Sequence, residues 1–338
     1  MKKRPSGTLL TALLALVLAA CHPIDPAEPA ARPAEDRVYR IGFGGFGPDI
    51  AADSAVAGYL EALEEEGFEE GRNLEVVRTH ASGEMGQLPQ VMQSLDARGL
   101  DILVPMTTPG ISAALGVVRN TPMVFVYSYD PIGAGAGESY DKHLPNITGV
   151  ASLPPIGDTM ELVLEMVAGT RTVGVLYSAS ETNCLKAVKE AREALEAHGA
   201  ALVAVTVTGT ADVFSAAQAL VAKAPDVIWL TGNTVLQVPE GAMKPAIEAR
   251  IPIILNDPEF VDRGALAAVG VSWEASGRAA GKMAARVLRG EAKPADLPIV
   301  ALSEPRMVLN QAVAEQLGIT FAPSLLEEAA EVIGAGQP

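Results

Sequence analysis

The chain has 338 residues, of which 49% are hydrophobic and only 4% aromatic, and its formal net charge is −16. Without the basic residues Lys2, Lys3 and Arg4 the net charge is about −19. This acidity argues against nucleic acid as a partner, because phosphate binding needs a basic surface, and against broad adhesion to anionic lipid. The length suits two lobes of ordinary domain size.

The first 20 residues have the features of an export signal. A basic start precedes an apolar run at residues 8–20, which is too short and too early for a membrane span. The run ends in Leu18-Ala19-Ala20-Cys21, which resembles a bacterial lipobox. That resemblance implies that Cys21 becomes the first mature residue and carries lipid; the alternative is an ordinary signal peptide with a chance cysteine. Residues 21–37, rich in Pro, Ala and acidic residues, are predicted to be a flexible tether.

From residue 38 onward, short apolar runs alternate with amphipathic stretches. The pattern predicts strands at residues 38–43, 74–78, 102–106 and 123–126, and helices at 51–66, 88–98 and from 107–109 onward. Strands that alternate with helices in this way predict a parallel sheet covered on both faces.

The same order is then repeated. Strands are predicted at residues 172–177, 202–207, 227–230 and 253–255, and helices at 184–198, 213–223 and 239–249. In each of the two repeated segments the last strand ends in an Asp-Pro dipeptide, Asp130-Pro131 in the first and Asp257-Pro258 in the second. After this second set come residues 264–271, a helix at 273–289, and residues 299–302 and 307–317. Open parallel sheets bind ligands at the carboxyl ends of their strands, so two facing lobes would line one cleft.

Several short sequence segments occur in the same order as in a known family. The chain resembles the type I periplasmic binding proteins, and specifically an ABC-transporter substrate-binding lipoprotein family related to aromatic amino-acid binders of the TrpX type. The matching segments lie at residues 101–104 with 107–109, 130–135, 146–150 with 153–155, 174–177, 232–235, 263–267, 277–278 with 281–284, and 323–326. One departure lies at residues 43–48, where Gly-Gly-Phe-Gly-Pro replaces a more polar first loop.

The resemblance implies an α/β fold with two Rossmann-like parallel-sheet lobes and a ligand cleft between them. It assigns residues 38–152 and 257–298 to an N-terminal lobe, and residues 153–256 and 299–330 to a C-terminal lobe. Three crossings between the lobes are expected, near residues 150–154, 256–258 and 298–303. The lobes are expected to close on ligand by hinge motion.

The function implied is capture of a small molecule, an amino acid of aromatic or branched type, for an ABC permease in the inner membrane. The protein would be a monomer held outside the cytoplasm by its lipid anchor alone, on the periplasmic side in a Gram-negative cell. The alternative is a ligand-sensing module for a membrane signalling protein. Neither reading involves an enzyme, a cofactor or nucleic acid.

Charged groups of a zwitterion would need two kinds of partner. Thr107 and Thr108, at a helix start, offer hydroxyls and free amides that favour a carboxylate, although plain N-capping explains them too. Asp130 and Asp257 could neutralise an ammonium, or could be turn residues before Pro. We expect one of the two aspartates to be structural.

The remaining ligand candidates lie on loops at strand ends. Aromatic residues there could stack on an apolar side chain or pack in the core, and a tight glycine loop would let ligand approach the backbone. Polar residues at later helix starts share the ambiguity of the two threonines. These candidates are Phe46, Gly47, Tyr127, Tyr129, Ser180, Thr182, Asn183, Asn233 and Thr234.

Other chemistries have little support. Residues 42–47 match G-x-G-x-x-G after a strand, but Pro48 and Asp49 follow, and an acidic residue there would repel a pyrophosphate. The four histidines lack metal-ligand spacing, so no metal site is expected. Cys184 near a helix start could be a reactive thiol, but a buried structural thiol is commoner.

Overall fold

The computed structural model describes residues 37–302 and 305–334. The expected signal peptide, Cys21 and all but the last residue of the tether lie outside the described residues. Within the described part of the chain, no helix combines the length and the apolar character that crossing a membrane requires.

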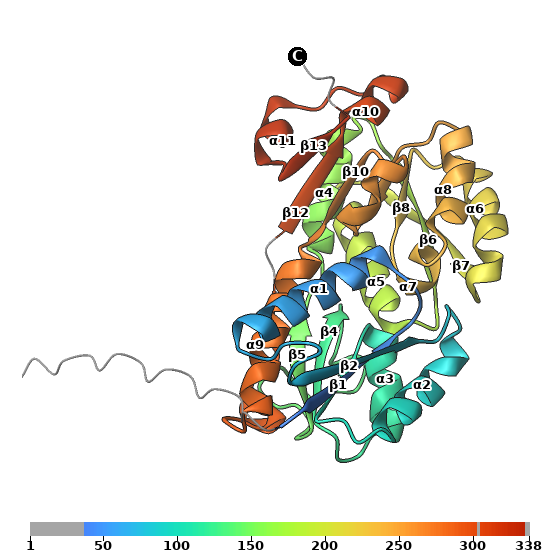
Figure 1. Ribbon diagram of the computed structural model, residues 1–338. Helices are drawn as coiled ribbons and strands as arrows, with labels where there is room; N and C mark the ends of the chain where they lie inside the picture. The colour runs from blue at the N-terminus through green and yellow to red at the C-terminus, as the bar shows by residue number, and fades with distance from the viewer. Residues whose placement is uncertain (1–36, 303–304, 335–338) are drawn as a thin grey trace, which may run out of the picture. The chain divides into compact units, whose positions relative to one another are not determined.

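Two sheets organise the described chain (Figure 1). The first sheet is entirely parallel and has the strand order β11-β5-β4-β3-β1-β2. Its strands are β1 (Tyr39–Gly45), β2 (Leu74–His80), β3 (Ile102–Pro105), β4 (Met123–Ser128), β5 (Ile147–Ala151) and β11 (Val300–Ala301).

The second sheet has the order β13-β12-β10-β9-β8-β6-β7 and is parallel except where β10 meets β12. Its strands are β6 (Thr172–Ser178), β7 (Ala201–Val207), β8 (Val227–Leu230), β9 (Ile253–Leu255), β10 (Ala267–Val271), β12 (Pro305–Asn310) and β13 (Glu331–Ile333). The segments β2-β1-β3-β4-β5 and β7-β6-β8-β9-β10 have the same order, as the repeated sequence pattern predicts.

Helices cover both faces of each sheet. In the first, α1 and α9 pack together on one face and α2 and α3 lie on the other; in the second, α4 and α5 lie opposite α6 and α8. The α-helices are α1 (Ile50–Glu65), α2 (Leu88–Asp96), α3 (Thr108–Val117), α4 (Ile156–Met166), α5 (Thr182–Ala197), α6 (Val213–Val221), α7 (Asn233–Leu236), α8 (Pro239–Glu248), α9 (Trp273–Leu288), α10 (Gln311–Leu317) and α11 (Pro323–Glu328). The 3₁₀ turns are η1 (Met85–Gln87), η2 (Thr210–Asp212), η3 (Pro258–Arg263) and η4 (Pro294–Asp296).

The expected crossing at residues 256–258 is wrong. After β9 the chain stays in the second sheet, because β10 pairs with β9 in parallel and with β12 in antiparallel register. It returns to the first sheet only between Val271 and Trp273, where α9 begins. Strand β11 pairs with β5, so residues 300–301 belong to the first sheet rather than to the C-terminal lobe. The Asp-Pro turn at residue 257 marks a strand end, and a strand end alone does not determine which sheet follows.

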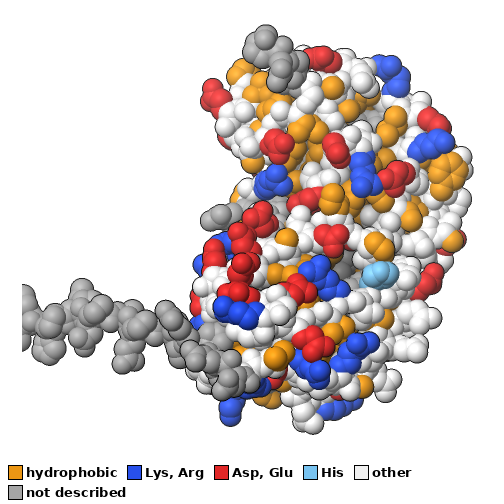
Figure 2. All heavy atoms as spheres, viewed as in Figure 1, with side chains coloured by type: hydrophobic (Ala, Val, Ile, Leu, Met, Phe, Trp, Pro, Cys, Tyr) orange, Lys and Arg blue, Asp and Glu red, His pale blue; other side chains and the backbone are white. Residues whose placement is uncertain are grey.

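Helices α1 and α9 approach each other closely because glycine lies at their contact. A Cβ atom at Gly277 would overlap the carbonyl oxygen of Ala55, and one at Gly281 would overlap that of Tyr59. The exposed side of α1 carries acidic residues, among them Glu61 and Glu65, which pair with Arg278 of α9. Acidic side chains accordingly gather on this face of the molecule (Figure 2).

Candidate functional site

A small pocket, with a cavity volume of about 10 Å³, lies where the carboxyl ends of strands from the two sheets meet. This is the place at which parallel sheets are expected to bind ligand. Segments that follow β3, β4, β8 and β9 all contribute to it, together with the start of α5. The lining residues are Thr108, Tyr127, Tyr129, Asn183, Gly232, Asn233, Leu236 and Asp257.

Helix α3 begins at the pocket. Thr107, with φ of 69°, caps the helix by accepting a hydrogen bond from the Gly110 amide at 3.2 Å. The hydroxyl of Thr108 lies 3.0 Å from that of Ser128 and accepts a hydrogen bond from the Asp130 amide at 3.1 Å. These bonds position Thr108 at the first turn of the helix, where backbone amides lack partners within the helix and attract anions.

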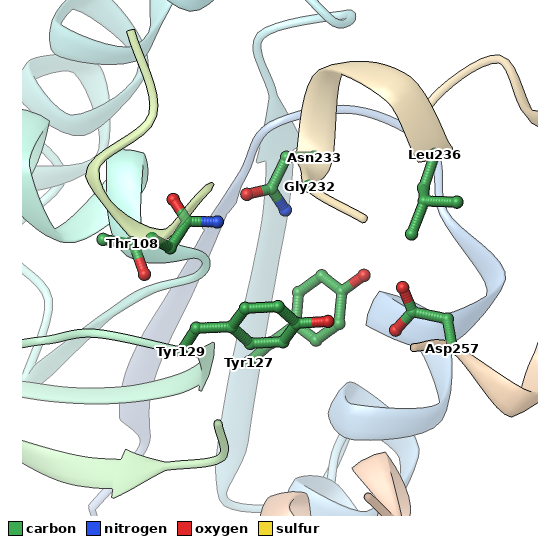
Figure 3. A pocket seen from close by; sticks show the side chains of 8 residues that line it. Thr108, Tyr127, Tyr129, Gly232, Asn233, Leu236 and Asp257 are labelled. Atoms are coloured by element: carbon green, nitrogen blue, oxygen red, sulfur yellow. The ribbon is translucent and has the colours of Figure 1, made fainter. Parts of the chain in front are cut away.

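An aromatic group forms one wall of the pocket. The ring of Trp273 is stacked on that of Tyr129, with centroids 5.9 Å apart and planes at 9°, and meets Tyr127 edge-on at 4.5 Å. Tyr127 has φ of 58°, an unusual conformation for a bulky residue, and the pairing of β4 with β5 shifts register there. A bulge of this kind redirects a side chain out of the regular alternation of a strand. In Figure 3 both tyrosine rings lie between Thr108 and Asp257.

Asp257 supplies a buried carboxylate to the pocket. Its side chain is only 2% exposed, and its Oδ1 accepts a hydrogen bond of 2.8 Å from the indole nitrogen of Trp273. Burial raises the pKa of Asp257 well above its ordinary value, and the neighbouring carboxylates of Asp49 and Glu259 raise it further. An ionised Asp257 is therefore a costly state unless a positive charge approaches it.

A second carboxylate, that of Asp49, lies behind the aromatic wall. Its Oδ2 accepts a hydrogen bond of 2.6 Å from the hydroxyl of Tyr127, and its Oδ1 accepts one of 2.8 Å from the Ala51 amide, which caps α1. Burial raises the pKa of Asp49, although these hydrogen bonds oppose the shift.

Glu181 satisfies the start of the short helix α7. This residue is 1% exposed, and its two carboxylate oxygens accept hydrogen bonds of 2.9 Å from the amides of Asn233 and Thr234. The protein thus supplies its own anion at α7, whereas the start of α3 has no acidic residue in its first turn.

The structure brings six of the thirteen expected ligand residues together in the pocket: Thr108, Tyr127, Tyr129, Asn183, Asn233 and Asp257. The side chain of Asp130 accepts a hydrogen bond from the Gly133 amide, as a turn residue does, and lies 3.8 Å from Lys186. Asp130 thus has the contacts of a turn residue, and it is not among the residues that line the pocket.

The other expected residues lie outside the pocket lining. Phe46 packs in a hydrophobic cluster, Thr107 caps α3, and the Thr234 amide binds Glu181. Ser180 and Thr182 are exposed. The space beside Gly47 is occupied by the side chain of Gln237.

Sequence reasoning missed four residues at or next to this site: Asp49, Gly232, Leu236 and Trp273. Asp49 follows Pro48 just before a helix, which is an N-cap signal, but nothing local links it to Tyr127, 78 residues away. Trp273, one of only two tryptophans, could have been singled out by its rarity.

Comparison with known proteins places the chain in a family. Residues 49–333 match the family model described as ABC transporter substrate binding protein. The chain belongs to this family. As a substrate-binding protein of an ABC transporter it has a binding role and works outside the cytoplasm. The α/β fold with two parallel-sheet lobes, expected from the sequence, is confirmed.

Individual relatives are similar to this substrate-binding protein over most of its length. A tyrosine-binding protein of Clostridioides difficile is 28% identical over 260 residues, which are 77% of this chain and 75% of that protein. A Streptococcus pneumoniae ABC domain in complex with L-Trp is 29% identical, with a TM-score of 0.83 over 88% of this chain and all of that one.

A third relative superposes less closely on this chain. The ligand-free, open structure of a substrate-binding protein with adhesive properties from Clostridium difficile is 26% identical. Its TM-score is 0.65 over 87% of this chain and 99% of that one. The present structure thus superposes better on the L-Trp complex than on the open structure, at similar sequence identity.

Proposed function

We propose that this substrate-binding protein captures an aromatic amino acid in the pocket and delivers it to an ABC permease. The observation that carries the proposal is Asp257, a buried carboxylate that lines a pocket walled by tyrosine rings. A buried carboxylate is stable in its charged form only when a cation or several donors compensate it. The ammonium group of an amino acid would supply that cation.

The ligand carboxylate would bind at the start of α3. Thr108 lines the pocket there, and the helix dipole and unpaired amides of a ten-residue helix favour an anion. The alternative anion site, at α7, is occupied by Glu181. The two charged ends of the ligand would therefore face Thr108 and Asp257, from opposite sheets.

The ligand side chain would pack against Tyr127, Tyr129 and Leu236. Aromatic rings bury large areas and add about 0.5–1.5 kcal/mol when they pair edge-on or offset. The named ligands of the two relatives, tyrosine and L-Trp, are aromatic amino acids and agree with this chemistry.

Lipid attachment through Cys21 completes the proposal, because a tethered monomer could reach a permease on the same membrane. Cys21 and nearly all of the tether lie outside the described residues. Cell fractionation tests the anchor: the Cys21→Ser variant should leave the membrane fraction. If it stays membrane-bound to the same extent as the wild type, the lipoprotein hypothesis fails.

Calorimetry with a matched panel of ligands tests the binding proposal. L-Tryptophan and L-tyrosine should bind; indole-3-propionate, which lacks the ammonium, and tryptamine, which lacks the carboxylate, should each bind at least about 30-fold more weakly. If neither amino acid binds, the aromatic assignment fails. If indole-3-propionate equals L-tryptophan, the ammonium site at Asp257 is wrong.

A further inference from the structure

We infer that Gln237 is a latch that holds the two sheets together around bound ligand, and that Gly47 and Gly83 form the notch that receives it. The inference rests on the proposed function. It also accounts for the glycine-rich first loop, which does not line the pocket.

The contact joins segments that belong to different sheets. The side-chain Nε2 of Gln237, just after β8 and α7, donates a hydrogen bond of 2.7 Å to the carbonyl oxygen of Pro48, just after β1. This bond links residues 189 positions apart in the chain. Because Pro48 and Gln237 follow strands of different sheets, separation of the sheets would break this bond.

Two glycines make room for the glutamine side chain. A Cβ atom at Gly47 would overlap the Gln237 amide, and one at Gly83 would lie 3.2 Å from Gln237 Cγ. The two loops are themselves tied, because the Gly83 amide donates a hydrogen bond of 2.9 Å to the Phe46 carbonyl. Thr210, from the second-sheet side, lies against the same notch, with its methyl carbon 3.5 Å from the position of a Gly83 Cβ.

Helix α7 connects the latch to the pocket. Asn233 and Leu236 line the pocket, and Gln237 follows them, with its amide bonded to the Asn233 carbonyl at 2.9 Å. Residues i, i+3 and i+4 of a helical turn share one face, so the ligand-facing residues and the latch lie on the same side of one turn. Glu181 anchors this turn from below through the Asn233 and Thr234 amides. Ligand that packs on Asn233 and Leu236 would therefore hold Gln237 at the notch.

Stopped-flow kinetics with L-tryptophan tests the latch. Gln237→Ala should speed dissociation about 2- to 12-fold, the range expected for one hydrogen bond, and leave the association rate unchanged. Gly47→Ala, which fills the notch at a residue without positive φ, should act in the same direction. Adding Gly47→Ala to Gln237→Ala should change little further, because both remove one interaction.

Matched controls are Gln90→Ala and Gly86→Ala, which lie on exposed surface with open space around Gly86. Both should dissociate like the wild type. Dissociation of Gln237→Ala at the wild-type rate, or additive effects in the double variant, would overturn the latch. Slower association with unchanged dissociation would also overturn it, since Gln237 would then act at entry.

A failure of the proposed function is distinguishable from a failure of the latch. If the wild type binds neither L-tryptophan nor L-tyrosine, the proposed function fails, and small-angle scattering of ligand-free protein decides the latch alone. Larger radii of gyration for Gln237→Ala and Gly47→Ala than for the wild type would support it. Equal radii for all three proteins would overturn it.

Discussion

The hydroxyl of Tyr127 donates a hydrogen bond of 2.6 Å to the carboxylate of Asp49, which also caps helix α1. One carboxylate thus connects the aromatic wall of the pocket to the helix that follows the first loop. The carboxylate of Asp49 raises the pKa of Asp257, and no basic side chain of the described chain is among the groups that shift the pKa of either aspartate. The pocket therefore favours a ligand that brings its own positive charge.

The two aspartates that end matching strands should behave unequally when changed. Asp257→Asn should weaken L-tryptophan binding about 30- to several-thousand-fold, or about 2–5 kcal/mol, because the ligand ammonium would lose its charged partner. The asparagine oxygen can still accept the hydrogen bond from Trp273, so the variant should fold. Asp130→Asn is the matched control and should bind nearly as the wild type does. Equal affinities for the two variants in calorimetry would contradict the assignment.

Stability of the ligand-free protein should depend on the Asp257 charge. The folded pKa of Asp257 lies well above 3.8, its ordinary value, so the folded state holds a proton that the unfolded state has lost. Stability should therefore fall as pH rises from about 4 through the raised pKa. Asp257→Asn should flatten this fall and be more stable than the wild type at neutral pH, as denaturant titrations across pH would measure.

Ligand binding should show the opposite dependence. An ammonium favours ionised Asp257, so L-tryptophan affinity should decrease as pH falls through the raised pKa, with release of a proton on binding. The groups around Asp257 are Asp49, Glu259, Trp273 and the two pocket tyrosines, of which only the carboxylates titrate in this window. Calorimetry in buffers of different ionisation enthalpy measures the released proton. Proton uptake, or none in the wild type, would refute the coupling.

The repeated alternation of strand and helix patterns was enough to predict both sheets, because hydrophobic periodicity reflects burial directly. The lobe boundary near Asp257 could not be read in the same way, since both sheets bury their strands equally well. The pocket could be predicted only in part. Thr108 and Asp257 follow the ends of strands, and the local sequence shows where those strands end. Asp49 and Trp273 join it only through folding, which brings Asp49 to Tyr127 and Trp273 to Asp257. The sequence predicts free space at Gly47, and in the structure the side chain of Gln237 lies there, because a missing Cβ does not specify what fills its space.

Close packing of α1 on α9 should make Gly277 intolerant of any side chain. Gly277→Ala would place a methyl group against the Ala55 carbonyl, and overpacking of this kind costs at least about 1–3 kcal/mol. Gly157→Ala, in α4 with open space around it, is the control and should be neutral or stabilising by up to about 1 kcal/mol. Thermal unfolding of both variants measures the difference. Equal melting temperatures would contradict the contact between the helices.

The two tryptophans should respond differently to ligand. Trp273 touches both pocket tyrosines and donates to Asp257, whereas the indole of Trp229 donates to Asn256 at 2.8 Å, and Trp229 does not line the pocket. A ligand ammonium at Asp257 changes the electric field at the Trp273 ring. L-Tyrosine, with excitation confined to tryptophan, should therefore shift the emission of the wild type and of Trp229→Phe but not of Trp273→Phe.

Trp273→Phe should also bind more weakly, because it keeps a ring but removes the donor to an ionised carboxylate. A hydrogen bond to a charged group contributes about 1.5–3 kcal/mol, which corresponds to roughly 10- to 150-fold in affinity. Without that donor the pKa of Asp257 should rise further, so the decrease of affinity on acidification should begin at higher pH than in the wild type. A purely structural role for Trp273 would lower the melting temperature and leave this pH profile in place. The profile therefore decides whether Trp273 acts on the ligand through Asp257.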